Sequence, residues 1–94
     1  LLTFSAPGYS IALDFPNTPR VRALVPEISH RVAECGGRVY LAKDALLTAG
    51  QFNRMYGDRA GQWRAILHEA DAKARFTSLM SERLEWKPWR GLHA

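Results

Sequence analysis

The chain has 94 residues, a net charge of +4 and 47% hydrophobic residues. This length predicts one small domain, and the apolar content excludes a disordered protein. A single cysteine, Cys35, excludes an internal disulfide and predicts a reducing, cytoplasmic setting. No apolar run approaches the roughly 20 residues that span a bilayer. Basic and acidic residues are interspersed along the chain, which argues against nucleic acid as a partner.

A β-hairpin is predicted for the N-terminal part of the chain. Residues 1–5 are apolar and β-prone, and a Pro-Gly turn signal follows them. Residues 9–15 then alternate, so one face of a strand carries Tyr9, Ile11, Leu13 and Phe15. On the other face, the small side chains of Ser10 and Ala12 either meet solvent or leave room for a ligand.

A helix is predicted after the hairpin. Thr18 fits the N-cap position and Pro19 the first helical position. Apolar residues then recur at helical spacing, at Val21, Leu24, Val25, Ile28, Val32 and Cys35. Pro26 within this stripe predicts a kink or a main helix that begins one residue later. Cys35 ends the stripe, which favours a place in the core over a role as nucleophile.

After the glycines at 36–37, residues 38–41 form a predicted third strand that carries Tyr40 on its polar side. The order strand, strand, helix, strand predicts an α+β fold, with an antiparallel sheet and helices packed on one face. This sheet would be the framework of the domain.

Three short helices are predicted for the second half, over residues 49–56, 59–70 and 79–84. The residues before them can cap a helix N-terminus, namely Thr48, Asp58 and Ser78. Thr48 and Gln51 also match a capping box. The domain would cover residues 1–84, followed by an extended tail over residues 85–94 that carries two of the three tryptophans.

Residues 36–44 hold the side chains with the best potential for chemistry. Lys43 follows a predicted strand end, where its amine can point into a cleft and stabilise a developing negative charge, with Tyr40 beside it as a hydrogen-bond donor. The alternative is an exposed Lys43 paired with Asp44. The histidines fall at no recognised metal-ligand spacing, and the glycine patterns that bind nucleotides are absent.

Two runs together resemble a known family. They are PGYSIALDFP at residues 7–16 and, after a helix, GGRVYLAKD at residues 36–44; FNRMY at residues 52–56 continues the match. The chain from residue 1 to about 84 resembles the C-terminal part of FAD-linked oxidases of the vanillyl-alcohol oxidase type. Within that family it is most similar to the decaprenylphosphoryl-ribose oxidase group and to the aldonolactone and alditol oxidases.

The resemblance implies a cap domain that lies over a flavin. It implies that Lys43 contacts FAD and the substrate, that Tyr40 lines the same site, and that Ser10 and Ala12 face the substrate. The family holds FAD mainly through an N-terminal domain, which is not in these residues.

The expected function is therefore the substrate- and flavin-covering part of an FAD-dependent oxidoreductase. It would oxidise a hydroxyl of a sugar, polyol or sugar lactone by hydride transfer to flavin, and these 94 residues alone would be inactive. Without the FAD-binding domain, an uncovered apolar sheet face would favour self-association. The alternative is a non-enzymatic α+β interaction module whose tryptophan-rich tail docks a protein partner.

Overall fold

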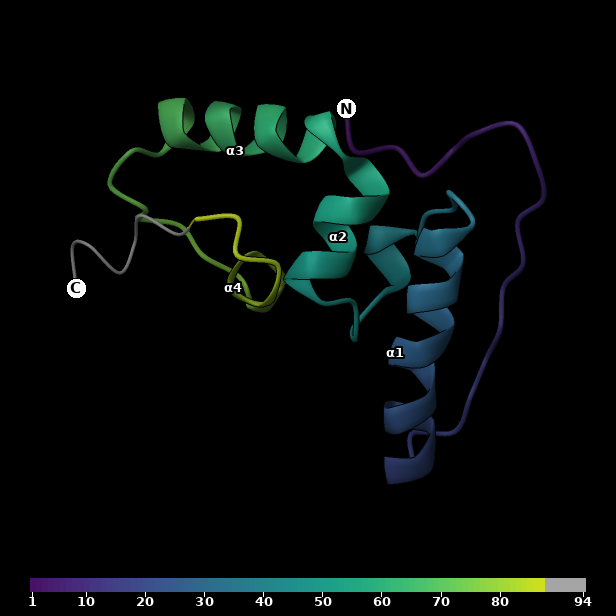
Figure 1. Ribbon diagram of the computed structural model, residues 1–94. Coiled ribbons are helices and arrows are strands. Elements are labelled where there is room, and N and C mark those ends of the chain that lie inside the picture. Colours follow the sequence, from purple (N-terminus) through teal and green to yellow (C-terminus); the bar gives the residue numbers. More distant parts are fainter. Residues whose placement is uncertain (88–94) are drawn as a thin grey trace.

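The computed structural model describes residues 1–87, and at Lys43 it describes the backbone alone. Within these residues, four α-helices and one 3₁₀ helix follow one another (Figure 1). They are α1 (Pro19–Glu34), η1 (Leu41–Lys43), α2 (Ala49–Tyr56), α3 (Asp58–Ala70) and α4 (Leu79–Arg83). Residues 1–87 contain no β-strand, so the predicted α+β fold with an antiparallel sheet is wrong. No helix in this part of the chain is long and apolar enough to cross a membrane.

The predicted hairpin is replaced by an irregular segment. Residues 1–17 have no regular structure, and most of them run in a wide arc away from the helices before joining α1 (Figure 1). The alternating apolar residues are exposed there, Ile11 by 79% and Tyr9 completely. Alternation expresses only a local preference, whereas a stable strand needs a paired neighbour and an apolar layer beneath it. Neither is present among residues 1–87.

The predicted strand over residues 38–41 is also wrong, because these residues pair with no neighbouring strand. Side-chain contacts with α2 hold this stretch in place instead. The Tyr56 hydroxyl in α2 donates a hydrogen bond to the Val39 carbonyl at 3.1 Å. The Arg38 guanidinium lies over the ring of the same tyrosine, 5.6 Å from its centroid. The chain then enters η1 at Leu41.

Helix α1 begins as predicted. The Thr18 hydroxyl accepts a hydrogen bond from the Val21 amide at 3.2 Å, and Pro19 occupies the first helical position. The helix continues through Pro26 as one element, so the expectation of a main helix that begins after it is wrong. A proline in the eighth position removes one intrahelical donor, so the carbonyl four residues earlier loses its usual partner. The carbonyl of Pro26 itself accepts a hydrogen bond from Gln51 Nε2 of α2 at 3.0 Å.

The buried face of α1 differs from the predicted stripe. Ser29 and Ala33 are the buried residues of the helix, whereas Leu24 and Cys35 are exposed. The expected core position of Cys35 is therefore wrong. Helix α1 packs on α2, and small side chains at the contact let two helices approach closely. The larger apolar residues of the stripe flank that contact.

The core forms around α2. The predicted capping box is confirmed, with the Thr48 and Gln51 side chains each accepting from the other's amide at 3.1 Å. Leu47 precedes the cap and Phe52 lies in the first turn, and both are fully buried together with Leu84 from the end of α4. The rest of the buried cluster is Ala33, Met55, Tyr56 and Ala60.

Helices α3 and α4 close over this core with help from Trp86. Its ring lies 5.6 Å from Phe52 and 5.4 Å from Trp63 in α3, centroid to centroid. The first tryptophan of the predicted tail therefore packs on the core, while Trp89 lies outside the described residues. Ser78 caps α4 as predicted, but α3 begins at Asp58 itself, which occupies the first helical position rather than the cap.

Candidate functional site

The candidate site begins where α1 ends. Gly36 adopts a φ of 77°, a conformation that favours glycine and stops the helix. Gly37 then passes close to the helix, because a Cβ added there would lie 2.8 Å from Cγ1 of Val32. The two glycines let the chain leave α1 in a tight turn, which directs the following residues toward α2 and the N-terminal segment.

Tyr40 lies on the surface with its ring held and its hydroxyl free. The side chain is 50% exposed, and its ring centroid lies 5.0 Å from that of Phe4. Arg38 Nη1 donates to the Thr3 carbonyl at 3.3 Å, so the start of the chain lies beside this stretch. Among residues 1–87 the Tyr40 hydroxyl has no hydrogen-bond partner, so it can donate to a bound molecule.

Lys43 is three residues further on, at the end of η1, and its side chain lies outside what the structure describes. η1 begins at Leu41, and Tyr40 precedes it as the N-cap residue, with an extended backbone (φ −73°, ψ 108°). The predicted pairing of Tyr40 with Lys43 therefore stays a prediction.

Asp44 closes the segment in a structural role. Its carboxylate accepts hydrogen bonds from the Leu46 and Leu47 amides, at 3.1 Å to Oδ1. Oδ2 pairs with Arg83 Nη1 of α4 at 3.0 Å, and the Asp44 side chain is only 6% exposed. Asp44 therefore ties the end of the candidate site to both α2 and α4.

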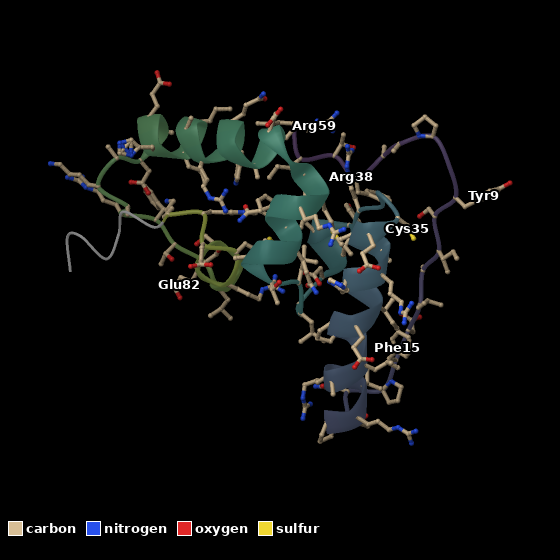
Figure 2. The ribbon with its side chains drawn as sticks, in the orientation of Figure 1. Tyr9, Phe15, Cys35, Arg38, Arg59 and Glu82 are labelled. Carbon is tan, nitrogen blue, oxygen red and sulfur yellow. The ribbon has the colours of Figure 1, made fainter. Side chains whose placement is uncertain are left out.

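Ser10 and Ala12 lie elsewhere. Both are exposed within the irregular N-terminal arc, where their neighbour Tyr9 projects away from the helices (Figure 2). No contact among residues 1–87 joins either of them to Tyr40. Their predicted substrate-facing role stays a prediction.

Sequence reasoning missed Phe4, Arg38 and Arg83 as neighbours of the site. Phe4 and Tyr40 are 36 positions apart, as the numbering shows, and no local pattern links them. The pairing of Asp44 with Arg83, 39 positions away, is likewise invisible without the fold. No group of three His, Cys, Asp or Glu residues within the described part of the chain could hold a metal ion.

The site is an open surface. A hollow of about 340 Å³ lies on α1, and another of about 240 Å³ lies between α3 and α4. Tyr40, Ser10 and Ala12 line neither of them. A half-exposed phenol with a free hydroxyl suits recognition of a carbonyl or an anionic oxygen.

In sequence, the chain is similar to part of an oxidase. It is 39% identical over 84 residues to decaprenylphosphoryl-beta-D-ribose oxidase of Mycolicibacterium smegmatis, a match that covers 89% of this chain and 18% of that protein. It is 32% identical over 84 residues to an uncharacterized protein in the mprA 5′ region of Streptomyces coelicolor, covering 88% of this chain and 23% of that protein. No family model matches. The chain thus spans about a fifth of the length of these curated relatives.

Proposed function

We propose that the chain is the C-terminal, substrate- and flavin-covering part of an FAD-dependent oxidoreductase of the vanillyl-alcohol oxidase type. The reaction is oxidation of a hydroxyl of a sugar, polyol or sugar lactone. The observation that carries this proposal is the 39% identity to decaprenylphosphoryl-beta-D-ribose oxidase, which extends through 89% of the chain. A match of that extent includes the whole of the run at residues 36–44, one of the two that carry the resemblance.

The proposal assigns FAD mainly to an N-terminal domain outside these 94 residues. Two facts support this division. The chain corresponds to 18% of the length of the oxidase, and Tyr40 lines neither of the two hollows described above. The 94 residues alone should neither hold FAD tightly nor catalyse the reaction.

The residues of the turn have distinct tasks in this proposal. FAD, when bound, supplies the acceptor for the hydride of the substrate carbon. The Tyr40 hydroxyl donates a hydrogen bond at the flavin edge or to the substrate oxygen, and its free, half-exposed position fits a group with acceptor atoms along one edge. The Lys43 ammonium offsets negative charge that develops there. Ser10 and Ala12 face the substrate once the N-terminal arc is covered.

The first test is the gene and the protein it encodes. An in-frame flavin-binding domain should precede residue 1, and the purified longer protein should show the absorbance bands of bound flavin. A sugar or polyol substrate should bleach those bands under anaerobic conditions. A reading frame that starts at or just before Leu1 would contradict the proposal, as would a longer protein without flavin.

A further inference from the structure

The geometry points to a docking surface on the N-terminal side of the molecule. We propose that residues 9–15, called the strap, and the hollow on α1, called the α1 groove, bind the remainder of the longer protein. This inference rests on the proposed function only in that the chain is part of a longer oxidoreductase. It adds the face through which the two parts meet.

The strap exposes every second side chain as an apolar group. The exposed fractions fall along it from Tyr9, which is completely exposed, through 79% and 61% to 43% at Phe15. No amide of residues 6–15 donates a hydrogen bond within the described part of the chain. Burial against a partner would remove the exposed apolar groups from water and give the unpaired amides acceptors. A partner that fits the strap therefore offers apolar side chains together with backbone hydrogen-bonding groups.

The α1 groove has matching chemistry. Ile28, Val32 and Cys35 lie at helical spacing along it, and its volume is about 340 Å³. It borders the core, because Val32 lines the groove and also packs against the buried cluster around α2. In the view of Figure 2, Cys35 projects from α1 toward the side on which the strap runs. A partner that covers the strap would therefore approach the groove as well.

The remainder of the longer protein is the occupant that the observations favour. The chain matches 18% and 23% of the length of its relatives, so most of such a protein lies outside these residues. The strap is also held at both ends, by the Phe4–Tyr40 ring contact before it and by the Thr18 cap of α1 after it. The contact at the N-terminal end of the strap includes Tyr40. A domain that covers the strap therefore also reaches the candidate site.

The experiment is hydrogen–deuterium exchange and cysteine alkylation of the purified longer protein. Amides of residues 9–15 should exchange at least about tenfold more slowly than the intrinsic rates of an unstructured peptide. Cys35, followed on the tryptic peptide of residues 32–38, should react with iodoacetamide at least about tenfold more slowly than a peptide thiol. Flavin absorbance is recorded on the same sample.

Paired variants of the longer protein sharpen the test. The double substitution Ile11→Asp with Leu13→Asp should restore fast alkylation of Cys35, because two buried charges would lift the strap from its partner. Leu79→Asp places the same charge on an apolar residue that is 88% exposed on α4, and it should leave the alkylation rate unchanged.

Three results would overturn the inference. The first is exchange of the strap and alkylation of Cys35 at peptide rates in a longer protein that carries flavin, which would leave the proposed function standing. The second is equal, concentration-dependent protection in the 94-residue chain, which would make a second copy the occupant. The third is an equal effect of the strap and Leu79 variants. Absence of flavin, by contrast, would count against the proposed function.

Discussion

Asp44 fixes one end of the segment that carries Tyr40 and position 43. Its buried carboxylate accepts from two successive amides before α2 and pairs with Arg83 from α4. Both carboxylate oxygens therefore accept hydrogen bonds. The Asp44 side chain is buried, whereas its partner Arg83 is 25% exposed. The contact joins residues 39 positions apart and so helps to hold the turn against the helices.

Replacement of the two partners of this ion pair should have unequal effects. Asp44→Ala should lower the free energy of unfolding by about 2–3 kcal/mol, because two amides and the guanidinium lose their acceptor. Arg83→Ala should lower it by only about 1 kcal/mol, since the amides keep theirs and the arginine is partly exposed. Urea unfolding followed by circular dichroism measures both. Equal losses would contradict the role of Asp44 as a cap of the loop.

Tyr40→Phe isolates the hydroxyl from the ring. The ring contact with Phe4 is retained, so stability should not change. In the longer protein, loss of the donor should slow substrate-driven flavin reduction by about tenfold. An unchanged rate of flavin reduction in the Tyr40→Phe variant would show that this hydroxyl has no role in the site. A thermal stability different from that of the unaltered protein would show that the hydroxyl has a structural role.

Among the elements, α1 contains the clearest local conflict. Pro26 lies inside the helix and has no amide to donate to the preceding turn. Pro26→Ala restores that donor and keeps the carbonyl that accepts from Gln51. The free energy of unfolding should therefore rise by about 1–3 kcal/mol. A decrease, measured by thermal unfolding, would show that the proline shapes α1 for its contact with α2.

The connection between α3 and α4 depends on Asp71. Its carboxylate accepts from the Arg75 and Phe76 amides, and Lys87 Nζ lies 2.5 Å from Oδ2. The hydrogen bond from Lys87, followed by those from the two amides, lowers the pKa of Asp71 from 3.8 to about 2. Because the pKa is lowered in the folded state, the stabilisation is complete above about pH 4 and is lost as the pH falls through about 2.

Lys87→Met should raise the pKa of Asp71 toward its ordinary value, while the two amides keep it somewhat depressed. Carboxyl titration by NMR between pH 1.5 and 6, chosen as a window of roughly two units on either side of the ordinary value, measures this. Lys73→Met, in the same connection, is the control and should leave the pKa in place. An unchanged pKa in the Lys87 variant would mean that the lysine does not hold the carboxylate.

The sequence-based predictions succeeded where a side chain and the backbone group that it bonds lie within one helical turn. The caps by Thr18, Thr48 and Ser78 are of this kind, because the side chain bonds an amide three residues away. The strands failed because a strand depends on a partner that no local pattern supplies. The alternation over residues 9–15 is real, but residues 1–87 contain nothing that pairs with it.

The candidate site divides in the same way. The roles of Tyr40 and Lys43 were inferred from local spacing and the family resemblance, and they stay predictions. The ring contact with Phe4 and the pairing of Asp44 with Arg83 span more than 30 positions, so they required the fold. The buried face of α1 was missed because the approach of α2 selected small side chains, Ser29 and Ala33, over the larger apolar stripe.

As a whole, the molecule is a thin helical layer. Its extents are 37, 32 and 18 Å, and α2 is the helix that contacts both α1 and α3 (Figure 1). A layer of this thickness, with an uncovered apolar strap along one side, suits a part that covers a larger body. This shape supports the proposal that the chain works as a cover and not as a complete enzyme.

The most direct test of this account is the rate of flavin reduction in the longer protein with Lys43→Ala. Stopped-flow mixing with substrate under anaerobic conditions measures that rate from the loss of flavin absorbance. The account predicts a rate at least about tenfold below that of the unaltered protein, with flavin content and thermal stability unchanged, because the lysine acts on charge that develops in the reaction. An unchanged reduction rate would contradict it.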